Sequence, residues 1–120
     1  MKYICLMLAE PEAFKRMSPE EAAEFTRQCL AYDHQLMERG LFVASNALES
    51  VTRSITVRKR NGKLSTTDGP FAETKERLCG YVLVDAHDLN AALEIAANSP
   101  FASLGAVEVR PVMEIDRNEL

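Results

Sequence analysis

Hydrophobic residues follow two different spacings along this chain, and the change between them marks its strands and helices. Residues 2–8 are apolar at nearly every position, which is typical of a strand buried on both faces. A loop containing Pro11 follows. The capped start of a helix is then indicated by Ser18, Pro19 and Glu21, and its end is indicated by Gly40. Within that helix a helical spacing places five residues on one stripe: Ala22, Phe25, Cys29, Tyr32 and Leu36. The pattern predicts a strand followed by a long helix that packs by one face.

A hairpin is predicted in the middle of the chain. Residues 41–48 and 52–60 favour strands, and in the second Ile55 and Val57 alternate with polar neighbours. Asn61 and Gly62 form the dipeptide most typical of a tight turn between two strands, and residues 63–67 supply the returning strand.

A second strand, helix and strand complete the chain. Residues 78–84 favour an apolar strand, Asp88 caps a second helix that Pro100 ends, and residues 105–115 alternate as a last strand. The order is β-α-β, an extra hairpin, then β-α-β. It predicts a ferredoxin-like α+β fold, with an antiparallel sheet and two helices on one face. Because the other face would be uncovered, we expect a second copy to cover it in a homodimer.

Composition narrows the classes of function. The 120 residues, 47% hydrophobic and 27% charged, suit one globular domain over residues 1–120. The net charge of −4, without a basic stripe, gives no support for a nucleic-acid partner. The apolar residues 3–9 are too few to span a membrane, and they lack the basic leader and cleavage site of a secretory signal. We therefore expect a cytoplasmic protein without a membrane partner.

The cysteines are interpreted as structural. Cys5, Cys29 and Cys79 are widely spaced among apolar residues, without the paired spacing of a zinc site, so we expect reduced core thiols. The chain lacks the phosphate-loop, dinucleotide-glycine, zinc-protease and serine-elbow motifs. We therefore expect no metal and no cofactor.

Residues 68–76, of sequence Asp-Gly-Pro-Phe-Ala-Glu-Thr-Lys-Glu, combine turn chemistry with several ionisable groups. The Asp-Gly-Pro start favours a turn, and Phe71 is expected to enter the core and pin the loop. Glu73, Lys75 and Glu76 would then remain on its rim. A rigid connection with solvated charges and a ligand-binding loop are both consistent with this stretch.

The same loop, together with residues 55–58, Leu78, Gly80 and residues 107–111, resembles the DGPF-type branch of the YCII-related domain family. The resemblance extends over nearly the whole chain. It implies a ferredoxin-like, dimeric α+β barrel from a family of small bacterial proteins that are often encoded beside extracytoplasmic-function sigma factors. It implies no settled reaction.

Some YCII-like relatives are proposed to use a histidine on the first long helix and an aspartate in an Asp-Pro-Phe motif after the second. The resemblance aligns these positions with Cys29 and with Ser99, which precedes Pro100 and Phe101. A neutral thiol and a hydroxyl cannot replace an imidazole oriented by a carboxylate, so we do not expect that mechanism here. His34 falls on the polar face of the helix and is expected in solvent.

Charged residues supply the remaining candidates. Asp33 lies at the edge of the helix stripe, where a structural hydrogen bond or a ligand would satisfy its carboxylate. Arg58, Arg110 and Glu108 occupy polar positions of strands, and predict an ion-pair network or an anion pocket on the uncovered sheet face. Lys75 is expected to be salt-bridged, since neighbouring carboxylates stabilise its charged form.

Two functions are consistent with these residues. The first is a homodimeric protein that binds a small anionic or polar molecule in a pocket around residues 68–76, with Asp68 or Glu73 as proton acceptor if chemistry occurs. The ligand-binding candidates are Asp33, Arg58, Asp68, Phe71, Glu73, Lys75, Glu76 and Arg110. The second is an interaction protein that acts with a sigma-factor system without catalysis, which the resemblance alone supports.

Overall fold

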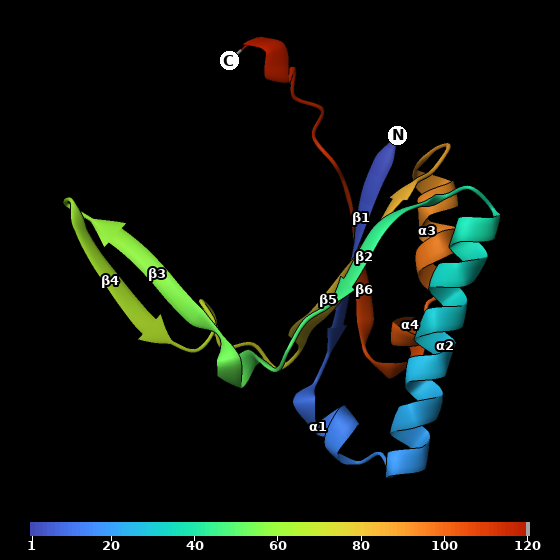
Figure 1. The fold of residues 1–120 in the computed structure, drawn as a ribbon, viewed down its shortest axis with the longest axis horizontal. Coiled ribbons are helices and arrows are strands. Elements are labelled where there is room, and N and C mark those ends of the chain that lie inside the picture. Colours follow the sequence, from blue (N-terminus) through green and yellow to red (C-terminus); the bar gives the residue numbers. More distant parts are fainter. Residues whose placement is uncertain (120) are drawn as a thin grey trace.

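The computed structural model describes residues 1–119, which form a helix-covered sheet and a projecting hairpin (Figure 1). The strands in this part of the chain are β1 (Lys2–Ala9), β2 (Phe42–Ala47), β3 (Ile55–Arg60), β4 (Lys63–Asp68), β5 (Arg77–Asp85) and β6 (Ala106–Pro111). The α-helices are α1 (Pro11–Lys15), α2 (Pro19–Glu38), α3 (Leu89–Ala97) and α4 (Pro100–Leu104), with short 3-10 turns at Val51–Arg53 and Arg117–Glu119.

The main sheet is antiparallel, with strand order β2-β5-β1-β6. β1 lies in its interior, paired with β5 on one side and β6 on the other, as its apolar character predicts. Tyr3, Cys5 and Met7 are buried on the face that the helices cover, whereas Ile4 and Leu6 are half-buried on the opposite face. We call this opposite face the open sheet face. The arrangement confirms the predicted ferredoxin-like α+β fold.

Helix α2 begins and ends where the sequence predicts. The Ser18 hydroxyl accepts a hydrogen bond from the Glu21 N–H, and the Glu21 carboxylate accepts one from the Ser18 N–H, both at 3.1 Å. This capping box satisfies two amides that a helix start leaves without partners. At the other end, Gly40 has a φ of +70°, and the Leu41 N–H donates to the Leu36 carbonyl at 2.9 Å.

The core lies between the sheet and the C-terminal half of α2. Tyr32 and Leu36 are buried there against Val84 and Ile95. The Tyr32 hydroxyl donates to the backbone carbonyl of Ile95 at 2.6 Å, which joins α2 to α3. In the N-terminal half of α2, by contrast, the residues facing inward, Phe25 and Cys29, are only half-buried. Core packing therefore holds the C-terminal half of α2 against the sheet, whereas the N-terminal half is less closely packed on it.

Strands β3 and β4 form a separate two-stranded sheet, which we call the arm (residues 55–68). The arm projects from the side of the main sheet away from α2 (Figure 1). Its turn residues, Asn61 and Gly62, have φ values of 52° and 75°, as a type I′ hairpin turn requires. The predicted hairpin is confirmed.

Two interpretations of proline positions are wrong. Pro11 begins a short helix, α1, rather than lying in a loop, because its fixed φ and missing N–H suit the first position of a helix. The second helix already ends at Ala97, and Pro100 begins α4, where the Ser99 hydroxyl accepts from the Phe101 N–H at 3.2 Å.

Two predicted strands are too long. Residues 51–53 form a 3-10 turn, so the strand expected from residue 52 begins at Ile55. The last strand ends at Pro111 rather than at residue 115, because its partner β1 begins at Lys2. The Val112 N–H makes the final contact, donating to the Lys2 carbonyl at 2.9 Å.

Candidate functional site

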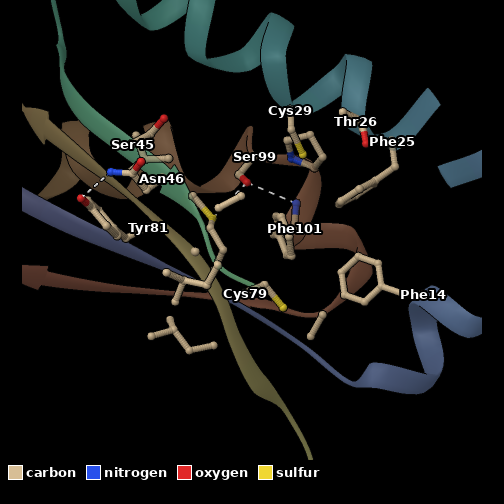
Figure 2. A pocket seen from close by; sticks show the side chains of 18 of the residues that line it. Phe14, Phe25, Thr26, Cys29, Ser45, Asn46, Cys79, Tyr81, Ser99 and Phe101 are labelled. Atoms are coloured by element: carbon tan, nitrogen blue, oxygen red, sulfur yellow. Dashed lines mark hydrogen bonds between the residues drawn. The ribbon is translucent and has the colours of Figure 1, made fainter. Parts of the chain in front are cut away.

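A cavity of about 710 Å³ lies where α2 stands off from the sheet. Its walls come from the middle of α2 (residues 25–33), from α1 and α4, and from the ends of β1, β2 and β5 that meet there. We call it the α2 cavity. Figure 2 shows side chains from these separate elements around one space.

Three phenylalanines gather at one end of the α2 cavity (Figure 2). The ring of Phe25 lies 6.0 Å from that of Phe14 and 5.1 Å from that of Phe101, with interplanar angles of 74° and 76°. Edge-to-face contacts of this kind are favourable because the positive ring edge meets the negative ring face. The cluster ties α1, α2 and α4 together and leaves an aromatic wall on the cavity.

The polar region of the cavity lies around Asp33, which is nearer the C-terminal end of α2 than Phe25 is. Asp33 follows Cys29 by one helical turn, and its carboxylate accepts a hydrogen bond of 2.5 Å from the Ser45 hydroxyl of β2. Ser99 is buried, and its hydroxyl donates to the Met7 sulfur at 3.4 Å. The cavity thus combines an aromatic end with two carboxylates, Asp33 and Glu49, two cations, Lys15 and Arg77, and a few hydroxyls and thiols.

The cavity thiols are held in their neutral form. Burial, and secondly the negative charge of Asp33, raise the pKa of Cys29 to about 11. Burial also raises the pKa of Cys79, which lines the same cavity. It raises the pKa of the buried Cys5 thiol to about 11. Because only the thiolate is a strong nucleophile, these cysteines are poorly suited to covalent catalysis. The prediction of buried thiols is right for Cys5, while Cys29 and Cys79 are half-buried.

Cys29 is expected to react slowly with iodoacetamide. A pKa raised by about two units lowers its thiolate fraction near pH 8 roughly a hundredfold, and the greater nucleophilicity of a thiolate of higher pKa offsets part of this, so its alkylation rate should fall about tenfold or more relative to the urea-unfolded chain. Peptide mass spectrometry over time measures the rate. Asp33→Asn should raise it modestly by removing the neighbouring charge. Equal rates in the folded and unfolded protein would contradict the raised pKa.

The loop of residues 68–76 does not enter the core, and the prediction that Phe71 pins it there is wrong. Phe71 is 75% exposed, and its ring instead lies against Arg58, whose guanidinium carbon is 5.0 Å from the ring centroid. The Gly69 N–H donates to the Ser54 carbonyl at 2.8 Å, and the Thr56 hydroxyl donates to the Gly69 carbonyl at 2.8 Å. These bonds hold the loop against the arm.

A second hollow, of about 650 Å³, lies where the arm meets the main sheet. Leu8 and Leu78 of the sheet, Ile55 of the arm, and Phe71 and Glu76 of the loop all line it. We call it the arm hollow. It shares one wall with the α2 cavity, formed by Leu48, Glu49, Ser50, Val51, Arg77 and Leu78.

Two of the predicted site residues form ion pairs. Lys75 Nζ lies 3.4 Å from a carboxylate oxygen of Glu10, so this lysine is salt-bridged as expected, although not to its neighbours in the loop. Arg110 Nη2 lies 2.6 Å from Glu108 Oε2 on β6. Both cations are largely exposed, and such pairs contribute only about 0–1 kcal/mol to stability. They agree with the ion-pair interpretation.

The remaining candidates are dispersed. Asp33 lines the α2 cavity, and Glu76 lines the arm hollow. Asp68 and Glu73 are exposed and line neither space. The structure therefore brings Arg58 and Phe71 together but separates this pair from Asp33. A ligand pocket built around residues 68–76 stays a prediction.

Sequence reasoning missed the aromatic end of the α2 cavity. Phe25 was recognised on the helix stripe, but nothing local indicated that Phe14 and Phe101 would meet it. A signal was present at Phe101, which follows Pro100 in the motif that the family resemblance aligned beside Ser99. Ser99 and Cys29, the two aligned positions, both line the α2 cavity, whereas His34 does not.

Within residues 1–119, no three or more His, Cys, Asp or Glu side chains are grouped so that they could hold a metal ion. Over the same residues, no helix has both the length and the apolar character needed to cross a membrane.

The strand order and the helix-covered sheet define a ferredoxin-like α+β protein with a ligand-sized cavity beneath its first long helix. The chain belongs to the YCII-related domain family, which matches residues 1–116. An uncharacterized protein of Rhizobium meliloti (strain 1021) is 34% identical over 122 residues, covering 100% of this chain and 98% of that protein.

A solved structure shares the fold. The 5-chloro-2-hydroxyhydroquinone dehydrochlorinase TftG of Burkholderia phenoliruptrix, in complex with 2,5-dihydroxybenzoquinone, matches with a TM-score of 0.55 at 13% identity. The match covers 94% of each chain. It supports the fold assignment over nearly the whole length of this protein.

Proposed function

We propose that this protein binds a small ring compound with hydroxyl substituents in the α2 cavity. The observation that carries the proposal is the cavity itself, which has about 710 Å³ of space and a mostly apolar lining with a few polar groups. Binding pockets for small molecules typically have about 300–1,000 Å³ and this kind of lining.

The aromatic end of the cavity favours a flat ring. Phe25 already contacts Phe14 and Phe101 edge to face, Phe14 lies tilted against Phe101, and a bound ring would extend this packing. Each favourable aromatic pair contributes about 0.5–1.5 kcal/mol beyond the area that it buries.

The polar end favours a neutral hydroxyl over an anion. The Asp33 carboxylate accepts hydrogen bonds and would repel a ligand carboxylate in a partly buried space. The Ser45 hydroxyl, which now donates to Asp33, can also accept from a ligand. Of the anionic or polar ligand expected from the sequence, the polar alternative fits the Asp33 end of this cavity, and the two lining cations, Lys15 and Arg77, are already bonded to the Glu12 carboxylate and the Ala72 carbonyl.

A structural neighbour with the same fold also holds a ring compound. TftG was solved with 2,5-dihydroxybenzoquinone, a six-membered ring with polar substituents. At 13% identity the likeness extends to the fold alone, so the ligand proposed here depends on the cavity of this chain.

The cavity supports binding more strongly than acid–base catalysis. The positions aligned with the histidine and aspartate of some relatives hold Cys29, a neutral thiol with a raised pKa, and Ser99, whose hydroxyl is already bonded to Met7 and Phe101. Neither group titrates near neutral pH. Asp33 is the carboxylate best placed to accept a proton from a bound hydroxyl.

The proposal predicts that hydroxylated rings stabilise the protein. Catechol and hydroquinone, whose hydroxyls are neutral at pH 7, should raise the melting temperature, since a ligand that binds only the folded state stabilises it. Benzoate should give a smaller shift because of Asp33. Phe25→Ala should weaken binding by about tenfold, which corresponds to about 1.4 kcal/mol of lost aromatic contact. Isothermal titration measures the affinities.

Phe71→Ala is the matched control, because it removes an exposed phenylalanine from the loop of residues 68–76. It should leave affinity unchanged while Phe25→Ala reduces it. A loss of binding in Phe71→Ala alone would reject the α2 cavity and favour the pocket that the sequence predicts around the loop. The absence of any shift across the panel would reject both.

Two further expectations from the sequence, a proton acceptor on the loop and a sigma-factor partner, remain proposals. Asp68 or Glu73 as proton acceptor depends on a ligand reaching the loop, and a sigma-factor partner depends on family context alone.

A further inference from the structure

The α2 cavity is larger than a single ring requires. Its volume is about 710 Å³, whereas an engineered protein cavity of about 150 Å³ is enough to hold a benzene molecule. One hydroxylated ring would therefore leave most of the space to water, which makes few favourable contacts with an apolar lining. The volume is in the range of pockets that hold larger small-molecule ligands.

The cavity also extends along α2. Phe25, Cys29 and Asp33 all line it and are four residues apart, so they form one row of side chains along the helix. At 1.5 Å per residue, the step from Phe25 to Asp33 corresponds to about 12 Å along the helix axis. Each step of four residues also rotates by about 40°, so the side chains at the two ends of the row diverge sideways as well.

The two ends of this row offer different contacts. Figure 2 shows Phe14 and Phe25 toward one side of the cavity and Ser45, whose hydroxyl donates to Asp33 at 2.5 Å, toward the other. A ring packed on Phe25 has its centroid about 5 Å from the Phe25 centroid, and a hydrogen bond spans about 3 Å. Even with the radius of the ring added, these lengths fall short of the distance between the two ends. A single ring therefore contacts one end at a time.

The middle of the row is suited to a second ring. Cys29 has a small side chain, and its thiol is neutral because burial, and secondly the charge of Asp33, raise its pKa to about 11. Contacts between sulfur and aromatic rings are favourable. On the sheet side, the lining includes Ala9 and Gly80, which add little bulk.

We propose that the ligand of the α2 cavity is an elongated compound of two or three linked or fused rings, with a hydroxyl group at its Asp33 end. One terminal ring lies on Phe25, the next passes over Cys29, and the hydroxyl donates to the Asp33 carboxylate. The inference rests on the proposed function, because it concerns the same cavity. It narrows the hydroxylated ring compounds to those long enough to contact both ends.

Isothermal titration of phenol and of 4-hydroxybiphenyl into the full chain tests the inference. Each compound carries one hydroxyl, which is neutral at pH 7, and the two differ by one ring. The affinity for 4-hydroxybiphenyl should be higher by about thirtyfold or more, because the second ring is also buried in the cavity. This comparison uses the wild-type chain and does not depend on the stability of any variant.

Variants along the row distinguish a ligand that spans the cavity from one held at a single end. Phe25→Ala and Asp33→Ala should each weaken binding of 4-hydroxybiphenyl by about tenfold, whereas binding of phenol should respond to only one of them. Cys29→Leu enlarges the side chain in the middle of the row. It should weaken binding of 4-hydroxybiphenyl by about tenfold and of phenol by less than about threefold. Phe71→Ala, outside the cavity, should change neither affinity.

The outcomes separate this inference from the proposed function. If phenol binds as tightly as 4-hydroxybiphenyl, or if 4-hydroxybiphenyl responds to only one of Phe25→Ala and Asp33→Ala, the spanning ligand is rejected while a ring site in the cavity stands. Two phenol molecules bound per chain, with 4-hydroxybiphenyl no tighter, would likewise reject it. If neither compound binds, both the inference and the proposed function fail.

Discussion

Gly105→Ala is expected to destabilise the protein by about 3 kcal/mol or more, at the upper end of what overpacking costs. Gly105 follows α4, and its N–H donates to the Phe101 carbonyl at 2.9 Å. A Cβ atom at this position would overlap the Leu8 carbonyl oxygen and lie 2.8 Å from the Ala9 Cα. Because these atoms belong to the backbone of β1, no side-chain rotation can relieve the overlap.

The effect would extend to the α2 cavity. Either β1 or α4 must shift to admit the methyl group, and α4 carries Ser99 and Phe101 into the cavity. Urea unfolding measures the change in stability, and titration with a hydroxylated ring measures the cavity. Gly40→Ala is the control: a Cβ there meets no atom within 4 Å, so only the strain of its φ of +70° remains, about 1–2 kcal/mol. Equal losses would refute the steric account.

Leu36→Ala is expected to lower the free energy of unfolding by about 2–5 kcal/mol. Leu36 is 2% exposed and packs in the core between α2 and the sheet. Its removal leaves a cavity in the half of α2 that is secured by packing. The packing of Leu36 in the core also positions the part of α2 that lines the α2 cavity. The affinity for a ring ligand should therefore fall as well.

Leu30→Ala is the matched control, since Leu30 lies on the same helix but is 65% exposed. It should change stability by less than about 0.5 kcal/mol, as surface substitutions generally do. Denaturant midpoints of the two variants measure the difference. A comparable loss in both would mean that α2 is not secured through its C-terminal half.

Short-range chemistry made much of the fold predictable. The capping box of Ser18 and Glu21 and the turn at Asn61 and Gly62 each depend on groups only a few residues apart. The strand boundaries were less predictable because a strand ends where its partner ends. The last strand stops at Pro111 for this reason, although its alternating pattern continues.

The candidate site was less predictable because it depends on contacts between distant segments. Phe71 looked like a core residue by type, yet the bonds of Gly69 to Ser54 and Thr56 direct its loop onto the arm. Asp33 was correctly recognised as a carboxylate that needs a partner, but the sequence could not identify Ser45 as that partner.

The sequence by itself determined the order of the main strands and of the two longer helices, the family and the chemical character of each stretch, since periodicity, capping and turn residues act locally. Only the tertiary structure decided that Phe14, Phe25 and Phe101 share one cavity and that the arm stands apart from the sheet. The physical reason is that a cavity forms where the packed side chains of several elements leave space unfilled. That depends on how all the elements fit together rather than on any one of them.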